Sequence, residues 1–123
     1  MIWRLLLFAC VSAFISVDAR AALQGEVNVH DPSTIIRQGN RYWVFGTGAG
    51  CISRYSSNLV TWFAGPRVFT TLPAWVPTAA PGNNGDLWAP DIILHSNQHY
   101  LYYSASVFGR NTSAIGLATN PTL

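Results

Sequence analysis

The sequence predicts an all-β fold built from repeated units of short strands. Two motifs that combine an aspartate with a proline, His30-Asp31-Pro32-Ser33 and Trp88-Ala89-Pro90-Asp91, each open a run of β-branched and aromatic residues. A shift of 58 positions places Tyr42 on Tyr100, and self-similarity of this kind is typical of repeat architectures. No window of the chain shows convincing helical periodicity. We therefore expect two copies of one strand-rich unit.

The first unit is expected to contain four strands. Ile35-Ile36 and Tyr42-Trp43-Val44-Phe45 flank a polar stretch in which Gly39-Asn40 supplies a turn. Two further strands are expected at residues 50–55 and 60–63. Aromatic and β-branched side chains favour strands because they fit a pleated, half-buried surface.

The second unit repeats this arrangement. Strands are expected at residues 92–94, 100–104 and 113–119, with a polar turn between the first two. The 58-residue shift aligns Ile36 with Leu94. Units of about four short strands, at a period somewhat above that of the common propeller repeats, indicate the blades of a β-propeller.

Residues 1–21 have the pattern of a secretory signal peptide. Arg4 precedes an apolar run over residues 5–17, and Ala19-Arg20-Ala21 offers a small-residue cleavage site. A membrane span is the alternative, but this run is shorter than the roughly 20 residues that a spanning helix needs. We expect a secreted protein, extracellular or periplasmic and without a membrane anchor, whose mature part is residues 22–123.

Residues 22–123 carry few charges and one cysteine. Five arginines stand against four carboxylates, which gives a net charge of +1, and lysine is absent from the whole sequence. No basic cluster of the kind that nucleic-acid-binding proteins show is present, so a neutral partner is expected. Cys51 has no second cysteine with which to form a disulfide in this region. A buried, unreactive thiol is its expected role.

Two aspartates and one tryptophan are candidates for a functional site. Asp31 opens an inner strand, from which its carboxylate could reach a central cavity, and a turn aspartate that caps its own backbone is an equal alternative. Asp91 could be catalytic, but binding of backbone amides is favoured for it. Trp88, beside this acid, is the aromatic residue best placed for a sugar-binding pocket; most of the others are expected in the core. A glycosidase needs two carboxyl groups, for which Asp31 and Asp91 would be the tempting pair.

Four segments together resemble the N-terminal part of the endo-1,5-α-L-arabinanases of glycoside hydrolase family 43. They are His30-Asp31-Pro32-Ser33, Tyr42-Trp43-Val44-Phe45-Gly46-Thr47-Gly48, Leu87-Trp88-Ala89-Pro90-Asp91-Ile92 and residues 102–116. The resemblance covers residues 29–123. It implies a five-bladed β-propeller with its active site in a surface groove over the axis. This chain would be the truncated N-terminal part, with blade 1 and most of blade 2.

The resemblance implies hydrolysis of internal α-1,5-L-arabinofuranosyl linkages in arabinan, a side chain of plant cell-wall pectin, with inversion. Asp31 would be the general base that activates a water molecule, and it must therefore be ionised near neutral pH. Trp88, Phe108, Gly109 and Asn111 would contact the arabinan or arabino-oligosaccharide beside it. Asn111 also begins a sequon for N-glycosylation, but the role at the groove is preferred.

The resemblance places three functional groups outside this chain: the general acid, an aspartate that tunes the pKa of that acid, and a histidine ligand of the central calcium. The family's general acid is a glutamate of the third blade, and Glu26 does not match its position. A histidine ligand of the family's central calcium belongs to a later blade, so no metal or other cofactor is expected here, although calcium fits a complete propeller. His95 and His99, beside a hairpin turn, are expected to be exposed. Without a general acid, this polypeptide alone is expected to be inactive.

Two other functions stay open. A non-catalytic arabinan-binding protein would keep the aromatic groove and bind sugar without cleaving it. A related arabinofuranosidase or xylosidase would keep the chemistry and act on branched arabinan, arabinoxylan or xylo-oligosaccharide.

Overall fold

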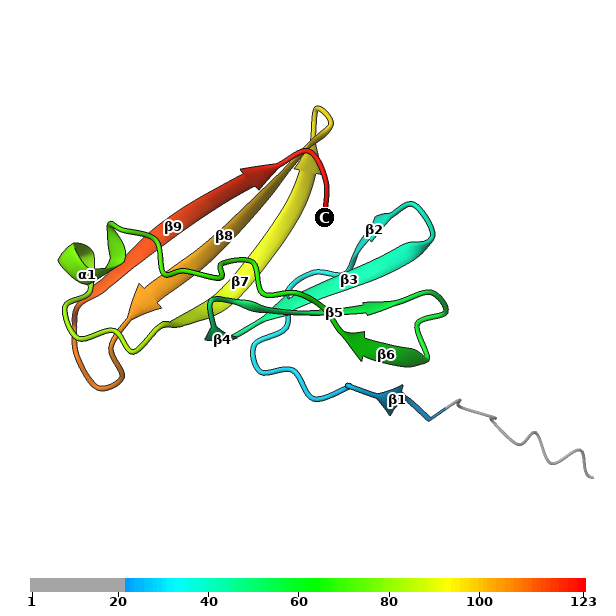
Figure 1. Cartoon of the computed structure of the whole chain (residues 1–123), viewed down its shortest axis with the longest axis horizontal. Helices are drawn as coiled ribbons and strands as arrows, with labels where there is room; N and C mark the ends of the chain where they lie inside the picture. Colours follow the sequence, from blue (N-terminus) through cyan, green and yellow to red (C-terminus); the bar gives the residue numbers. More distant parts are fainter. Residues whose placement is uncertain (1–21) are drawn as a thin grey trace, which may run out of the picture.

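The computed structural model describes residues 22–123, which form two β-sheets that pack against each other (Figure 1). A long connection over residues 65–85 leads from the outer part of the first sheet to the start of the second. Nearly all the regular structure is strand, which confirms the all-β prediction. The predicted signal peptide, residues 1–21, lies outside the described residues.

The first sheet contains the four predicted strands of the first unit. β2 (Ile36–Gln38), β3 (Arg41–Gly46), β5 (Ile52–Ser56) and β6 (Thr61–Ala64) are antiparallel neighbours in chain order. Their bounds differ from the predicted ones by one or two residues. A fifth strand, β1 (Gln24–Gly25), pairs parallel with β6 and covers the edge of the sheet. A strand of two residues shows no alternation that a sequence pattern can reveal.

The second sheet has the order β4-β7-β8-β9. β7 (Asp86–His95), β8 (Gln98–Ser106) and β9 (Ser113–Asn120) are the predicted strands of the second unit. The turn between β7 and β8 consists of Ser96-Asn97, with φ angles of 49° and 61°. Positive φ at both positions is typical of the type I′ hairpin turn. β4 (Gly48–Ala49) comes from the first unit and pairs with β7, so the two units share this sheet.

The β2–β3 and β7–β8 hairpins differ in length. Ile36 lies opposite Trp43 in the first hairpin, and Ile92 lies opposite Leu101 in the second. Trp43 and Leu101 keep the 58-residue spacing, and both are buried. Ile36 and Ile92, however, are only 56 residues apart, so the alignment of Ile36 with Leu94 is wrong. The second hairpin continues one residue pair further before it turns.

One short helix, α1 (Val76–Ala79), interrupts the connection between the sheets. Four residues are too few for a helical period to appear in the sequence, which explains why no helix is predicted there. Among residues 22–123, no helix is long and apolar enough to cross a membrane.

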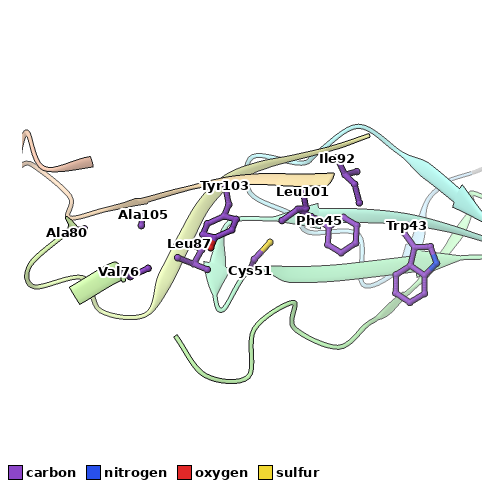
Figure 2. Close-up of a cluster of buried hydrophobic side chains, with 10 residues drawn as sticks. All are labelled: Trp43, Phe45, Cys51, Val76, Ala80, Leu87, Ile92, Leu101, Tyr103 and Ala105. Atoms are coloured by element: carbon purple, nitrogen blue, oxygen red, sulfur yellow. The ribbon is translucent and has the colours of Figure 1, made fainter. Parts of the chain in front are cut away.

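The hydrophobic core lies between the two sheets and continues under α1 (Figure 2). Side chains on one face of each sheet meet there, because alternate residues of a strand point to the same side. Three aromatic side chains are buried there and Tyr55 and Phe69 pack against them, so fewer aromatic residues lie in this core than the sequence predicts. The buried members are Trp43, Phe45, Cys51, Val76, Ala80, Leu87, Ile92, Leu101, Tyr103 and Ala105.

Cys51 is a fully buried thiol in this core, as predicted. Figure 2 shows its sulfur among the side chains that join the two sheets. Burial raises its pKa to about 12, because the charged thiolate would lose its hydration. The nucleophilic thiolate is therefore scarce at neutral pH.

The expected exposure of His99 is wrong. Its side chain is only 4% exposed, and its Nδ1 lies 3.2 Å from the backbone carbonyl oxygen of Asn120. The turn before β8 has only two residues, so the alternation of the strand begins at once. His99 therefore shares the inner face of β8 with Leu101 and Tyr103. His95, on the other side of the turn, is exposed as predicted.

Candidate active site

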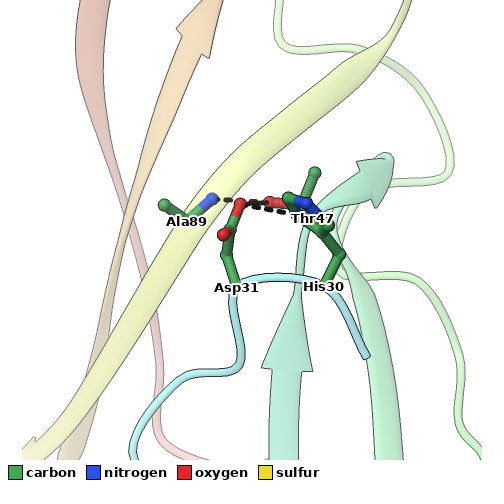
Figure 3. Close-up of polar contacts among 4 residues, drawn as sticks. All are labelled: His30, Asp31, Thr47 and Ala89. Atoms are coloured by element: carbon green, nitrogen blue, oxygen red, sulfur yellow. Dashed lines mark hydrogen bonds and ion pairs between the residues drawn. The ribbon is translucent and has the colours of Figure 1, made fainter. Parts of the chain in front are cut away.

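Asp31 lies in the segment between β1 and β2, where the two sheets meet (Figure 3). Its φ of 46° is in the left-handed region, which aspartate adopts more readily than most residues. Its side chain is 45% exposed. Solvent therefore reaches the carboxylate, while the backbone holds it in an uncommon conformation.

One oxygen of the Asp31 carboxylate holds two neighbouring side chains. Thr47 donates a hydrogen bond from Oγ1 to Oδ2 at 2.8 Å, and His30 Nδ1 lies 2.8 Å from the same oxygen. Within residues 22–123, the other oxygen, Oδ1, has no hydrogen-bond partner. The hydrogen bonds of the carboxylate thus go to side chains and not to its own backbone.

These contacts lower the pKa of Asp31. The hydrogen bond from Thr47 is the largest cause, the hydrogen bond and charge of His30 act in the same direction, and partial desolvation opposes them. Donors that point at a carboxylate favour its charged form. Asp31 is therefore ionised at neutral pH, as a general base must be.

Trp88 lies on a β-bulge in β7, across the junction from Asp31. The bulge falls between Trp88 and Asp91, where β7 has one residue more than β8, and bulges of this kind re-aim the side chains beside them. Ala89, inside the bulge, has a φ of 41°. Its N–H donates to Thr47 Oγ1 at 2.8 Å. The structure thus brings the bulge that carries Trp88 to the same threonine that holds Asp31.

Asp91 binds backbone amides, the role that the sequence favours for it. Its Oδ1 accepts hydrogen bonds at 2.9 Å from the N–H groups of Thr34 and Ile92. These bonds, that from Thr34 first, lower the pKa of Asp91. Thr34 precedes β2 and Ile92 belongs to β7, so this carboxylate fastens the first sheet to the second.

Phe108, Gly109 and Asn111 lie in the loop between β8 and β9. Phe108 is 91% exposed, Gly109 has a φ of 76°, and Asn111 is exposed. The loop follows the part of β8 that pairs with the start of β7, so it lies at the same end of the sheet as Trp88. It makes no hydrogen bond to Asp31 within the described part of the chain. These three residues therefore face solvent and are not hydrogen-bonded to Asp31 within residues 22–123.

The described residues do not form a metal site by themselves. Among residues 22–123, no three His, Cys, Asp or Glu side chains come together in a way that could hold a metal ion. His30 lies beside Asp31, with Nδ1 2.8 Å from Oδ2 of that carboxylate.

Thr47 is the residue that the sequence analysis does not single out. It lies between Gly46 and Gly48 directly after a buried strand, a position that sequence patterns assign to a turn. A threonine between two glycines is a weak sequence signal for a functional residue, because the hydrogen-bond partners of its hydroxyl lie far away along the chain. Asp31 is 16 positions away from Thr47 and Ala89 is 42.

The structure resembles solved arabinanases. It superposes on the endo-arabinanase of Bacillus licheniformis with a TM-score of 0.77 and 41% identity, over 81% of this chain and 35% of that one. The match to the α-L-arabinanase of Cellvibrio cellulosa has a TM-score of 0.75 and 46% identity, over 80% and 31%. The two sheets are accordingly blades of the five-bladed β-propeller of these enzymes.

Curated relatives give the same result from the sequence. The extracellular exo-α-(1→5)-L-arabinofuranosidase ArbA of Cellvibrio japonicus is 46% identical, over 80% of this chain and 28% of the relative. The extracellular endo-α-(1→5)-L-arabinanase 1 of Bacillus subtilis is 39% identical, over 88% and 35%. This chain thus spans roughly a third of the length of these relatives. The sequence profile of glycosyl hydrolases family 43 matches residues 25–123, and the chain belongs to that family.

Proposed function

We propose that this chain supplies the general base of an enzyme that hydrolyses α-1,5-linked arabinan, with Asp31 in that role. The observation that carries the proposal is the state of its carboxylate. Asp31 is ionised, reachable by solvent and fixed through Oδ2, while Oδ1 accepts no hydrogen bond within residues 22–123. Oδ1 is thus the oxygen that can take a proton from water as the water attacks the anomeric carbon.

The family membership and the names of the relatives support the substrate. ArbA is named an exo-α-(1→5)-L-arabinofuranosidase, the Bacillus subtilis enzyme is named an endo-α-(1→5)-L-arabinanase, and one Cellvibrio arabinanase structure is a complex with arabinohexaose. Trp88 would stack against a sugar ring beside Asp31, and Phe108, Gly109 and Asn111 would contact the chain further along. We further propose that the protein is secreted, since both relatives are named extracellular.

In this mechanism, inversion needs a second carboxyl group that protonates the departing oxygen. The carboxylates of residues 22–123 are those of Glu26, Asp31, Asp86 and Asp91. Asp91 is engaged with two backbone amides and its pKa is lowered, so it holds no proton to donate at neutral pH. Glu26 pairs with Arg54 and Asp86 accepts a hydrogen bond from Asn84, so we assign the general acid to a residue outside residues 22–123.

The substitution Asp31→Asn in the complete gene product tests the role of the base. Asparagine keeps the shape of the side chain but cannot accept a proton, so kcat on linear arabinan is expected to fall by about 10²- to 10⁴-fold. Binding of arabinohexaose, measured by calorimetry, is expected to change little. Asp86→Asn is the matched control, because its carboxylate bonds only to Asn84 of the connection in the described structure. An Asp31→Asn enzyme with full activity would remove Asp31 from the role.

Exo action is the second candidate, because the relative with 46% identity is named an exo-acting arabinofuranosidase. We place endo action first, because several other relatives are named endo-acting. The products of linear arabinan separate the two modes. An endo enzyme lowers the viscosity of the polymer before much reducing sugar appears, whereas an exo enzyme releases short products of one length from the start. The anomer formed first, observed by NMR, tests inversion in both cases.

A further inference from the structure

Thr47 connects the candidate base to the neighbouring sheet through three hydrogen bonds. Its Oγ1 donates to Asp31 Oδ2 at 2.8 Å and accepts from the N–H of Ala89 at 2.8 Å, while its own N–H donates to the carbonyl oxygen of His30 at 2.9 Å. Figure 3 shows these residues together at the junction, with Asp31 and His30 on one segment and Ala89 on β7. One hydroxyl is thus both donor and acceptor between two blades.

We propose that Thr47 is a positioning residue that fixes the orientation of the Asp31 carboxylate and couples it to the Trp88 bulge of the second blade. The proposal deepens the proposed function on which it rests. The Ala89 N–H occupies a lone pair of the Thr47 oxygen, which directs the single hydroxyl hydrogen toward Asp31. Because the hydroxyl hydrogen goes to Oδ2, the other oxygen of the carboxylate is left for water.

His30 is a weaker anchor for the same carboxylate. The side chain of His30 is 78% exposed, so water competes for its hydrogen bond and the ring is free to turn. Thr47 is only partly exposed and is fixed by its backbone as well as by its side chain. The orientation of Asp31 therefore depends more on Thr47 than on the histidine.

The charged groups around Asp31 are few. His30 is the one whose charge acts on the carboxyl group within residues 22–123. On β7, which packs against this segment, the titratable side chains are Asp86, Asp91 and His95. Asp91 is tied to Thr34 and Ile92, and His95 lies at the far end of the strand. Thr47 is therefore the group whose removal alters the surroundings of the base most.

The coupling also accounts for the backbone strain at the junction. Asp31 and Ala89 both have φ in the left-handed region, at 46° and 41°, which is uncommon for residues other than glycine. Such conformations persist where surrounding contacts over-determine them. Thr47 supplies a contact to each of the two residues. Loss of its hydroxyl would free the base and the bulge together.

The test compares Thr47→Val and Thr47→Ser in the complete gene product. Valine has nearly the same shape without the hydroxyl, so kcat on linear arabino-oligosaccharides is expected to fall roughly 10- to 100-fold with little change in KM. The acidic limb of the pH profile of kcat/KM is expected to move to higher pH, because the donor that favours ionised Asp31 is gone. Serine retains the hydroxyl and is expected to restore both. Thr61→Val, on β6, is the matched control.

The outcomes separate this inference from the proposed function. A Thr47→Val enzyme with unchanged kcat and an unchanged acidic limb overturns the inference, even where Asp31→Asn is inactive. If Asp31→Asn is fully active, the proposed function fails, and the ¹³C carboxyl titration of Asp31 decides the inference. Thr47→Val must then raise the pKa of Asp31 and Thr47→Ser must not. If the valine variant gives no cooperative thermal transition, Thr47→Ala takes its place in both experiments.

Discussion

The carboxylate of Asp91 stabilises the junction between the sheets, whereas that of Asp31 is directed to solvent. Asp91 accepts two backbone N–H groups at 2.9 Å, one from β7 and one from the segment that precedes β2. Asp31 makes hydrogen bonds to two side chains, Thr47 and His30, through one oxygen only. The two aspartates stand in similar motifs in the sequence. The carboxylate of Asp91 stabilises the fold, whereas that of Asp31 keeps one oxygen without a hydrogen-bond partner among residues 22–123.

Asp91→Ala is expected to lower the free energy of unfolding by about 1 kcal/mol at pH 7, because two amides lose a charged acceptor at a solvent-exposed position. The pKa of Asp91 is lowered in the folded state. Its contribution is therefore complete above the ordinary value of 3.8 and is lost as the pH falls through the lower folded value. Urea unfolding at pH 7 and at pH 2.5 measures this.

Asp91→Asn is the matched variant, because it keeps an acceptor oxygen in the same place. It is expected to lose less stability than Asp91→Ala at pH 7. The difference in free energy of unfolding between the wild-type protein and Asp91→Ala is expected to be smaller at pH 2.5 than at pH 7. An equal difference at both pH values would show that the charge of the carboxylate contributes nothing to stability.

Single residues were predictable where the signal was local. Asp31, Trp88 and Asp91 stand in short motifs with prolines, and their types indicate what they can bind. The role of Thr47 is visible only in the folded structure, where the turn after β3 lies against the bulge of β7. That encounter is a tertiary contact between segments 42 residues apart, and it has no local pattern.

At the scale of elements, the two blades are joined by backbone pairing as well as by core packing. β4 belongs to the turn between two strands of the first sheet, but its partner is β7. β7 also carries the bulge that reaches Thr47. Both contacts, the pairing of β4 with β7 and the bond from the bulge to Thr47, therefore fix the second blade against the first near Asp31.

Gly116→Ala is expected to destabilise the second blade. A Cβ at this position of β9 would overlap the ring of Tyr103 on β8, which is only 2% exposed and packs against Phe69. The ring cannot move aside without disturbing the core, so a loss of about 1–3 kcal/mol is expected. Thermal unfolding followed by near-ultraviolet circular dichroism measures it.

Gly39→Ala is the contrasting variant. Gly39 has a φ of 60°, but a Cβ there would meet no atom within 4 Å. Its cost comes from backbone strain alone and is expected to be about 1 kcal/mol.

Combining Gly116→Ala with Tyr103→Leu is expected to recover part of the stability lost in Gly116→Ala, because the smaller side chain makes room for the added Cβ. No recovery would assign the loss at Gly116 to another cause.

The strands were predictable because each has several residues of clear alternation, whereas β1, β4 and α1 are too short to have a period. The β-bulge was not predictable for a different reason. Its extra residue is defined by the partner strand, and Ala89, which has positive φ, bonds to Thr47 of a distant segment. The error in hairpin length has the same origin, since pairing register is a property of two strands.

For the whole molecule, the outward face of each sheet is apolar. On the second sheet, Ile93, Tyr102, Ile115 and Leu117 are exposed on the face opposite the core. On the first sheet, an apolar cavity of about 330 Å³ lies among residues that include Val44 and Trp62. Blades of a propeller cover such faces by packing against their neighbours.

A polypeptide limited to residues 22–123 is therefore expected to bind the dye ANS and to self-associate as its concentration rises. Ile115→Ser, at 73% exposure, is expected to weaken this association, and sedimentation velocity measures it. The same polypeptide is expected to release no arabino-oligosaccharide from arabinan, because it has no available general acid. Release of product by this polypeptide would overturn the assignment of the acid to a residue outside it.

The burial of Cys51 makes the junction between the blades measurable. Its thiol is fully buried in the core that the two sheets share and is the single thiol of residues 22–123. A reagent such as an aromatic disulfide can reach it only when this core opens. In the polypeptide of residues 22–123, its rate of labelling therefore reports how often the interface opens, without any added probe. A neighbouring blade or a bound oligosaccharide that holds the interface closed would lower the rate at which Cys51 is labelled.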